Sequence, residues 1–449
     1  MSDSKDAFKL VYQPDEKSRS IRDTVIYTIQ WIFTMFYPVI WGYVIVGLGL
    51  GLTGAELAGY MTRVVLMIGV CTLVQVLAGH KFAMVSGPNI IPSLAIVAAV
   101  VVGGREYALQ AFNAYIIAGI GVAILGGFGI ISHISKVWTP LVSGSMIMMV
   151  GLATSSVGVS NIAAFGPSLP FFFGIAIALI CGFIAIKGKG MLATIPVLIA
   201  IVLGYVIFIA MGRFDWDLVT SMPAFVLPQV FPYGLSMPPM SLIITMFVVN
   251  IFSAVNMYGN IQGYTGIIGA KTDKKDERRY FTIFGLVEGT LTGIFGVPSH
   301  VAYGENLGMI LLTRVAAKVF IIIASIIFIV LSFFGPVGGM MAAMPAPVAG
   351  AVLLGVASTL IGIGASNWFS QKFQTREIFI VGFSVFLALG LSVLPEEFYA
   401  GIPSIVASIM NNSVIMVIIL CIIMEQIVFR KKKRKVRDIK IYQKKERKT

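Results

Sequence analysis

The sequence predicts an all-α polytopic membrane protein with fourteen transmembrane segments, arranged as two inverted repeats of seven spans. Three observations lead to this prediction: the composition, the lengths of the apolar segments, and the distribution of Lys and Arg among the loops. Of the 449 residues, 57% are hydrophobic and only 12% are charged, which is outside the usual range of water-soluble domains. At roughly 20 residues per crossing, fourteen helices need about 280 residues and leave no room for a large soluble domain.

The apolar segments between loop or charge markers number fourteen. They lie at about 22–46, 57–79, 88–102, 107–131, 139–158, 168–186, 191–212, 240–264, 280–296, 304–315, 316–336, 347–368, 377–394 and 411–429. The third and the tenth are too short to cross roughly 30 Å of hydrocarbon as helices alone. Polar or Gly/Pro-containing stretches, 81–88 and 298–303, precede them. We therefore expect spans 3 and 10 to be broken, each as a short strand followed by a half-helix.

The Lys and Arg residues support this number of spans when the N-terminus is placed inside and every span reverses the direction of the chain. Thirteen of them then fall in inside loops or at inside span ends: Lys81, Lys136, Lys187, Lys189, Lys271, Lys274, Lys275, Arg278, Arg279, Arg314, Lys318, Lys372 and Arg376. Only Arg63, Arg105 and Arg213 fall outside. This excess follows the positive-inside rule and predicts a multi-pass protein of the cytoplasmic membrane with both termini in the cytoplasm.

The two predicted broken spans resemble each other. Ser-Gly-Pro-Asn at 86–89 precedes the first short apolar run, and Tyr-Gly-Glu-Asn at 303–306, 217 positions later, precedes the second. Seven spans per half is an odd number, so the halves must be inverted relative to each other, as in transporters with discontinuous helices that meet near the membrane midplane. Two facing helix N-termini would offer N–H groups and positive dipole ends to a polar solute.

The two ends of the chain are predicted to be cytoplasmic tails. The formal net charge is +13, and residues 430–449 carry twelve Lys or Arg against two acids. A basic run directly after an apolar helix is typical of a tail that lies against anionic lipid, so we do not expect nucleic-acid binding. Residues 1–21 mix Lys with Asp and Glu and lack an apolar core after a basic start, which excludes a cleaved signal peptide.

Acidic residues within the predicted spans are few: Glu288 lies in the ninth and Glu305 at the head of the tenth, with Glu56 and Glu425 near the membrane surfaces. A carboxylate within the membrane is costly and usually faces a cavity or relays protons. Both interior acids also have a structural alternative. Glu288 would then bond a neighbouring backbone group in helix packing, and Glu305, next to Gly304, would cap a helix.

The eighth span carries an amide stripe. Asn256 and Asn260 are four residues apart and share one helix face, with Asn250 and Ser253 close to the same stripe. A carboxamide offers both a donor and an acceptor, which matches the edge of a nucleobase or similar heterocycle; the alternative is hydrogen bonding between helices. Phe82, just before the first break, is placed to stack on a planar ligand, or else to serve in packing.

Signatures of catalysis are missing from the sequence. It has no HExxH motif, no Gly-rich phosphate loop with a Lys, and no acid-rich cluster in the spans. Ser299 and His300 are adjacent and by themselves do not give the geometry of a nucleophile and its base. The remaining His and all Cys residues are dispersed: His80, His133, Cys71, Cys181 and Cys421. We therefore expect no enzyme activity, metal site, disulfide framework or cofactor.

Residues 305–314, Glu-Asn-Leu-Gly-Met-Ile-Leu-Leu-Thr-Arg, resemble the signature of the nucleobase-ascorbate transporter family, also called nucleobase:cation symporter-2 or xanthine/uracil permeases. That signature is an acid or amide, Asn-x-Gly, four residues and Thr-Arg. Gly-Val-Pro at 296–298 and Tyr-Gly at 303–304 extend the resemblance, which covers essentially the whole hydrophobic chain. It implies fourteen spans in two inverted repeats and, commonly, a homodimer.

The resemblance also implies a division of the transmembrane region, 22–429, into two domains. Spans 1–4 and 8–11 form a core domain at about 22–131 and 240–336, and spans 5–7 and 12–14 form a gate domain at about 139–212 and 347–429. Glu305 and Gly304 would hydrogen-bond a nucleobase, Phe82 would flank it, and Glu288 would match an acid of the ninth span that is tied to proton coupling. The predicted substrate-binding residues are therefore Phe82, Asn256, Asn260, Tyr303, Gly304, Glu305 and Asn306, and the predicted proton-coupling residues are Glu288 and Glu305.

The chain departs from the family pattern at three positions. Asn256 stands where uracil and xanthine permeases usually carry Glu, and Asn260 is near a position that is often His. Gln30-Trp31 stands where the family usually has Gln-His. These residues are closer to a branch of purine permeases, and they leave the proton-coupling scheme and the substrate open.

The sequence thus predicts a secondary active transporter that imports a purine or uracil, with H⁺ as the coupling ion, by movement of the core domain against the gate domain. An anion carrier is the alternative, because sulfate and bicarbonate families share the inverted seven-span plan. A membrane enzyme and a passive channel are less favoured alternatives.

Overall fold

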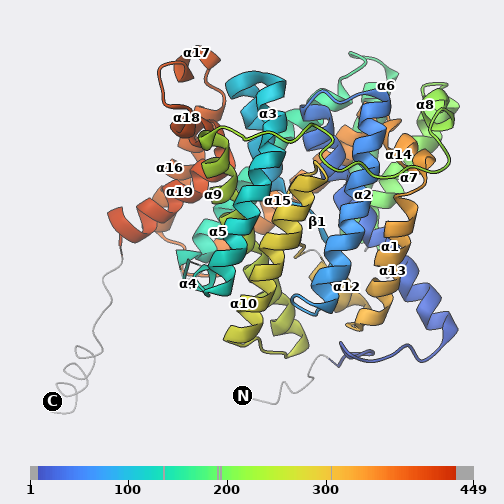
Figure 1. Cartoon of the computed structure of the whole chain (residues 1–449), viewed down its shortest axis with the longest axis horizontal. Helices are drawn as coiled ribbons and strands as arrows, with labels where there is room; N and C mark the ends of the chain where they lie inside the picture. The colour runs from blue at the N-terminus through green and yellow to red at the C-terminus, as the bar shows by residue number, and fades with distance from the viewer. Residues whose placement is uncertain (1–8, 135–136, 190–191, 193–194, 305, 431–449) are drawn as a thin grey trace.

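The computed structural model describes residues 9–134, 137–189, 192, 195–304 and 306–430. These residues form a bundle of helices with one two-stranded sheet, and most of the long helices run along a common direction (Figure 1). Eight of the described helices are long and apolar enough to cross a membrane, or up to ten if each of two sharply bent pairs is one span. The prediction of a helical polytopic membrane fold is confirmed at this level.

The first half of the chain, where spans 1 to 7 were predicted, contains the elements from α1 to α8. Its elements are α1 (Ile21–Trp41), continued by the π-helical η1 (Gly42–Gly47), α2 (Gly54–Leu77), β1 (Ser86–Pro88), α3 (Ile90–Gly127), α4 (Ile131–Ile134), α5 (Pro140–Ile162), α6 (Leu169–Lys187), α7 (Pro196–Ala210) and α8 (Trp216–Thr220). The long α3 is kinked at Gly103 and Gly104, and Gly104 has a φ of 76° that favours glycine. This kink falls between the predicted segments 88–102 and 107–131.

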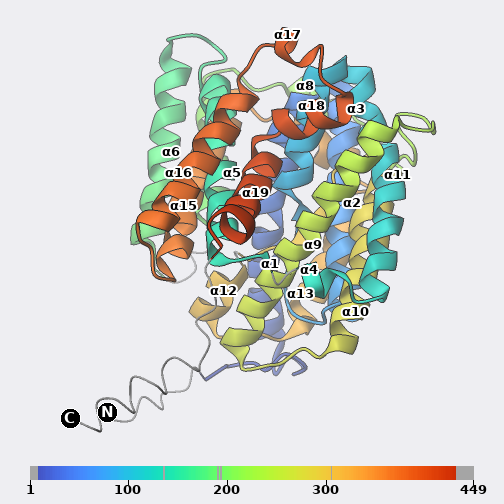
Figure 2. The same cartoon turned by 90° about the vertical axis from the view of Figure 1, so that its left-hand side faces the viewer.

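The second half begins with α9 (Met240–Ile268) and α10 (Lys274–Ile283), which continues as the π-helical η4 (Phe284–Leu291) and α11 (Thr292–Ile294). The remaining elements are β2 (His300–Ala302), α12 (Asn306–Thr313), α13 (Lys318–Leu331), α14 (Gly335–Ala342), α15 (Ala346–Phe369), α16 (Thr375–Ser392), α17 (Glu396–Tyr399), α18 (Ser404–Asn411), α19 (Ser413–Ile423) and the π-helical η5 (Met424–Val428). In Figure 2, α6, α15 and α16 lie on one side of the bundle, and α2, α9 and α10 lie on the other.

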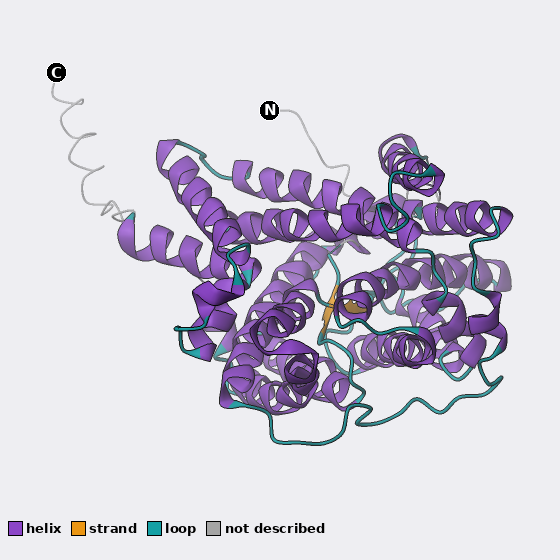
Figure 3. Cartoon of the chain, turned by 90° about the horizontal axis from the view of Figure 1, so that it is seen from above, coloured by secondary structure: helices purple, strands orange, loops and turns teal. Residues whose placement is uncertain are grey.

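The two strands join the halves of the chain in the middle of the bundle (Figure 3). They are antiparallel, with Ser86 opposite Ala302 and Pro88 opposite His300, and every residue in them is buried. Gly87 is required here, because a Cβ at this position would lie 2.3 Å from Pro38 of α1. Each strand is followed directly by a helix, α3 after β1 and α12 after β2, so two helix beginnings lie close to the sheet.

Small residues allow the closest helix pair, α5 and α15, to pack backbone against backbone. Gly144, Gly151 and Gly158 are spaced by seven along α5. A Cβ on Gly144 or Gly151 would crowd α15, at 2.6 Å from the carbonyl oxygen of Gly364 and 2.9 Å from that of Ala357. In return, a Cβ on Gly350 would lie 2.4 Å from the carbonyl oxygen of Gly158. Close approach through small residues is the usual way in which helices associate in lipid, and it fixes one wall of the cavity described below.

Candidate functional site

A cavity of about 540 Å³ lies where the strand pair and α9 face α5 and α15. Its polar lining consists of amide and hydroxyl side chains, Asn89, Ser143, Asn256, Asn260, Asn367 and Ser370, and its aromatic lining consists of Trp41, Trp138 and Tyr303. None of the described residues that line it is charged. A small, mainly apolar cavity with a few polar groups is the usual form of a site for a small neutral molecule.

Asn89 lines this cavity at the beginning of α3. It is the N-cap of α3, where its side-chain Oδ1 accepts a hydrogen bond from the backbone N–H of Ile91 at 3.1 Å. Its Nδ2 is buried and has no partner among the described residues. An unpaired buried N–H group costs free energy, so this amide is not fully satisfied by the fold.

The amide stripe of α9 divides into two parts. Asn256 and Asn260 line the cavity, whereas Asn250 and Ser253 are fully buried elsewhere in the core. Asn260 donates from Nδ2 to the carbonyl oxygen of Ala302 in β2 at 2.8 Å, so it is partly committed to the fold. Asn256 is half-buried and forms no hydrogen bond among the described residues, which leaves its carboxamide available to a ligand.

Tyr303 and Gly304 close the cavity on the side of β2. The Tyr303 backbone N–H donates to the carbonyl oxygen of Val85 at 3.0 Å, and its hydroxyl donates to the carbonyl oxygen of Pro88 at 2.5 Å. A Cβ on Gly304 would lie 2.7 Å from Oδ1 of Asn260, so a glycine is needed for the chain to pass this close to α9.

A second cavity, of about 240 Å³, lies on the other side of Tyr303. Asn306 lines this smaller cavity, and its Nδ2 donates to the carbonyl oxygen of Tyr303 at 2.8 Å. Asn306 therefore does not share the larger cavity with Asn256 and Asn260, although Tyr303 belongs to both.

Like Asn306, the predicted residue Phe82 is not brought to the larger cavity. Its ring lies parallel to that of His80, with centroids 6.0 Å apart, and 5.2 Å from that of Tyr264. Glu305, predicted from the sequence to contact the base, lies outside the described residues.

Glu288 lies in η4, fully buried and outside both cavities. Its Oε2 accepts a hydrogen bond from Nε2 of Gln75 in α2 at 2.6 Å. Its Oε1 is buried without a hydrogen-bond partner among the described residues, and the hydroxyl of Ser86 in β1 lies in its neighbourhood. No lysine, arginine or histidine of the described chain forms an ion pair with it.

Among the lining residues that were not predicted as site residues are Trp41, Asn89, Trp138 and Asn367. For Asn89 the sequence contains a signal, because an Asn directly before a helix and after Gly-Pro is a candidate N-cap at a chain break. The other three come from α1, the segment before α5, and α15. Their convergence depends on how these elements pack, and no local pattern indicates it. Among the described residues, no group of three or more His, Cys, Asp or Glu side chains could hold a metal ion.

Comparison with known sequences gives a family and several relatives. Residues 22–397 match the model of a family described as "Permease family", for xanthine and uracil permeases. The chain is 25% identical to the xanthine permease of Bacillus subtilis (strain 168), over 86% of this chain and 89% of that protein. It is 24% identical to the uric acid permease PucK of the same organism, over 82% and 87%, and 26% identical to the uracil permease of Bacillus caldolyticus, over 67% and 72%.

Comparison with solved structures supports the fold alone. The transmembrane domain of the cyanobacterium bicarbonate transporter BicA superimposes with a TM-score of 0.60 at 12% identity, covering 92% of this chain and 98% of that one. The murine Solute Carrier 26 family member A9 anion transporter, in its inward-facing state, superimposes with a TM-score of 0.56 at 12% identity, covering 88% and 68%.

Proposed function

The chain belongs to the nucleobase-ascorbate transporter family of xanthine and uracil permeases, and on this premise we propose that it is a secondary active transporter that imports a nucleobase, a purine or uracil. The single observation that carries the proposal is the 540 Å³ cavity, which is lined by the amide residues Asn89, Asn256 and Asn260 and by Trp41 and Trp138. Carboxamides match the alternating donors and acceptors of a base edge, and indole rings match its faces.

We propose that the helices form fourteen spans. In this assignment, spans 1 to 4 are α1 with η1, α2, β1 with the first part of α3, and the second part of α3. Spans 5 to 7 are α5, α6 and α7, and spans 8 to 11 are α9, α10 with η4 and α11, β2 with α12, and α13. Spans 12 to 14 are α15, α16 and α19 with η5. The core would then be spans 1–4 and 8–11, moving against a gate of spans 5–7 and 12–14 in a homodimer. The cavity lies between these two groups of elements, where such a movement would carry a bound base across the membrane.

We propose that the cytoplasm lies on the side of Pro140 at the start of α5 and Ser370 just after α15. Both residues line the cavity, and the adjoining loops carry Lys136 and Lys372, as the positive-inside rule requires of cytoplasmic loops. The cavity would then be an inward-facing site.

We propose H⁺ as the coupling ion, with Glu305 and Glu288 as the groups that carry it. Glu305 stands in the sequence between Gly304, which lines the cavity, and Asn306, so its carboxylate is the group that we assign to the N–H groups of the base. Glu288 is fully buried and lacks a cationic partner among the described residues, as expected of a carboxyl group that gains and loses a proton during transport.

The alternative cargo, an inorganic or organic anion, has the fold likeness to BicA in its favour. The chemistry of the cavity opposes it, because the described lining contains no cationic side chain and the neighbouring Glu305 would repel an anion. The fold supports several cargoes, and the lining favours a neutral heterocycle.

The proposal is tested by thermal unfolding of the detergent-purified protein with a panel of purines, uracil, bicarbonate and sulfate. A ligand that binds only the folded state raises the apparent Tm, so we expect one base to raise it and both anions to leave it unchanged. We expect Glu305→Ala to abolish this shift and to abolish uptake without loss of folded protein, and Asn256→Ala to change the order of preference among bases. A shift with an anion and with no base would contradict the proposed cargo, and near-normal uptake by Glu305→Ala would contradict its role.

A further inference from the structure

Gln75 connects the buried carboxyl group to the chain segment that leads into the cavity. It is fully buried near the end of α2. Its Nε2 donates to Oε2 of Glu288 at 2.6 Å, and its Oε1 accepts from the backbone N–H of His80 at 3.3 Å. One carboxamide thus bridges η4 and the loop that follows α2. It uses its N–H group as the donor toward Glu288 and its oxygen as the acceptor from His80.

The loop is shaped around this amide. A Cβ on Gly79 would lie 1.8 Å from Oε1 of Gln75, so residue 79 must be a glycine if the amide is to stay where it is. The backbone oxygen of Gln75 also accepts from the N–H groups of Gly79 and Lys81, both at 3.0 Å. Lys81 has a φ of 66°, a conformation that side chains rarely adopt, so the local backbone is held in place by its surroundings.

The same loop leads directly into the larger cavity. The N–H of Phe82 donates to Nδ1 of His80 at 3.0 Å, and the chain continues into β1 and then to Asn89, which lines the cavity. Arg279 of α10 fixes the loop from outside, since its Nε donates to the carbonyl oxygen of Gly79 at 3.0 Å. A change in the Gln75 bridge therefore acts on a segment whose far end contacts the cavity.

We propose that Gln75 is a positioning residue that links the charge state of Glu288 to the segment 79–89 and hence to the base-binding cavity. The inference deepens the proposed function and rests on it for the identity of the ligand. A hydrogen bond to an ionised carboxylate is about twice as strong as one to a neutral group. When Glu288 is ionised, it binds the Gln75 carboxamide firmly. The amide oxygen that accepts from the backbone N–H of His80 is then held in place as well. When Glu288 takes up a proton, this hold weakens and the loop is released.

Apart from the Ser86 hydroxyl, which lies on the same segment 79–89, the other groups around Glu288 do not connect it to the cavity. Cys71 of α2 is the neighbouring ionisable group with which it has an electrostatic interaction, and its thiol points to the carbonyl oxygen of Val287. His300 of β2 is engaged through Nδ1 with the carbonyl oxygen of Pro298 at 2.8 Å. From α9, α3 and β1, the groups that face this part of η4 are neutral: the Asn250 amide, the Gly119 backbone and the Ser86 hydroxyl.

The test is the pH dependence of base binding to the purified full-length protein, with the base that raises its Tm as the probe. Gln75→Met keeps the length of the side chain and removes the donor. We expect the midpoint of the pH profile to move by about one unit to higher pH, because the ionised carboxylate loses one charge-assisted hydrogen bond. In a Glu288→Gln background the same substitution should produce no shift. A shift that persists in that background, or an unshifted profile in Gln75→Met alone, would overturn the inference.

Two further variants separate this role from a structural one. Gly79→Ala removes no polar group but occupies the place of the Gln75 amide, so it should move the profile in the same direction, and it provides the test should Gln75→Met fail to fold. Gln262→Met is the matched control, because Gln262 is exposed and bonds only Thr272 among the described residues; it should leave the profile unchanged.

An infrared titration keeps the inference distinct from the proposed function. The infrared carboxyl band of Glu288 is identified as the band that is absent from the spectrum of the Glu288→Gln variant. The pH at which half of this band has disappeared, its midpoint, is measured without any ligand. If no base binds to the wild-type protein at any pH, the proposed function fails. If that midpoint is the same in the wild type and Gln75→Met, the inference fails, whatever the ligand is.

Discussion

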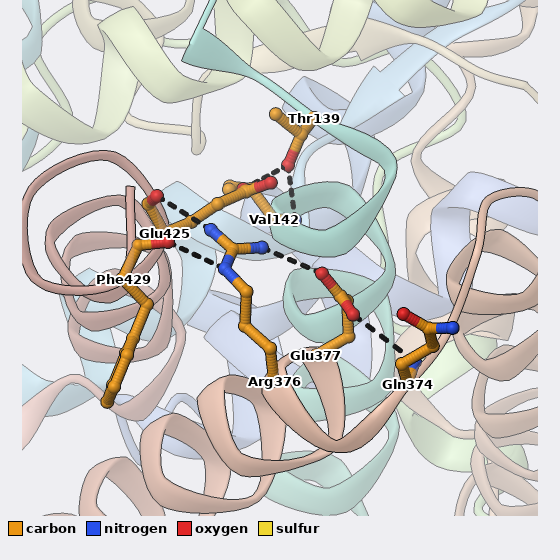
Figure 4. Close-up of polar contacts among 7 residues, drawn as sticks. All are labelled: Thr139, Val142, Gln374, Arg376, Glu377, Glu425 and Phe429. Atoms are coloured by element: carbon orange, nitrogen blue, oxygen red, sulfur yellow. Dashed lines mark hydrogen bonds and ion pairs between the residues drawn. The ribbon is translucent and has the colours of Figure 1, made fainter. Parts of the chain in front are cut away.

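Two buried glutamates, Glu377 and Glu288, differ in the partners of their carboxylate oxygens. Glu377 in the first turn of α16 is 1% exposed, and Glu288 in η4 is 0% exposed. Oε1 of Glu377 pairs with Nη1 of Arg376 at 2.7 Å, and its Oε2 accepts from the backbone N–H of Gln374 at 3.2 Å (Figure 4). Within the described parts of the chain, Oε2 of Glu288 has one neutral donor, Gln75, and its Oε1 has no hydrogen-bond partner.

The surroundings of Arg376 extend this contrast. Its guanidinium also donates to the carbonyl oxygens of Phe429, at 2.6 Å, and Glu425, at 2.9 Å, at the end of η5 (Figure 4). The side chain of Glu425 in turn accepts from the hydroxyl of Thr139, the N-cap of α5, at 2.5 Å. Arg376 and Glu425 together thus connect the ends of three helices. Removing one partner of a buried ion pair is costly, whereas Glu288, without a cation among the described residues, is the acid to which we assign a change of charge.

The largest effect on stability is expected from Arg376→Ala. Removing one partner leaves Glu377 buried without its cation, and loss of one partner of a buried pair costs about 3–5 kcal/mol. We expect a large decrease in Tm of the purified protein, measured by thermal unfolding, together with near-normal uptake per folded molecule. Arg278→Ala, at an exposed position of α10, is the control and should leave Tm nearly unchanged. An unchanged Tm in Arg376→Ala would mean that the cluster at the ends of α5, α16 and η5 does not hold the helices together.

Glu288→Gln is expected to give the opposite result. The substitution keeps the shape of the side chain and removes the ability to change charge, so the folded protein should persist with a similar Tm. Uptake driven by a pH gradient should fall by at least about tenfold, which corresponds to about 1.4 kcal/mol of lost coupling free energy. The measurement is uptake of base into proteoliposomes with and without the gradient. Full gradient-driven uptake by Glu288→Gln would show that this carboxyl group is structural, like Glu377.

The sequence could predict one of these two acids but not the other. Glu288 was identifiable because it interrupts an apolar span, and the structure finds it fully buried. Glu377 stands at the beginning of the predicted thirteenth span beside Arg376 and Gln374, where a helix end at the membrane surface is the ordinary interpretation. Its burial results from the packing of the end of η5 and the start of α5 against α16, which no local pattern encodes.

The same distinction applies to the cavity. The repeated motif at 86–89 and 303–306 predicted two related breaks, and the structure contains two short strands that pair with each other close to these positions. The spacing of Asn256 and Asn260 predicted a shared face, and both line the cavity. Gln75, Trp41 and Trp138 could not be predicted, because the place of each depends on packing between segments that are far apart in the sequence. For Gln75, the partner Glu288 is 213 positions distant.

The smallest effect, and the sharpest test of the contrast, is expected from the double variant Arg376→Met/Glu377→Met. Removing both charges leaves no unpaired ion, and exchange of a buried ion pair for apolar side chains of similar size is often neutral or slightly stabilising. We expect a Tm much closer to that of the wild type than to that of Arg376→Ala, because the main cost in the single variant is the stranded carboxylate. The backbone carbonyl oxygens at the end of η5 also lose their donor, which limits the recovery. A double variant as unstable as Arg376→Ala would show instead that the arginine acts mainly through these carbonyl oxygens, and Glu377 would then resemble Glu288 in having no essential cation.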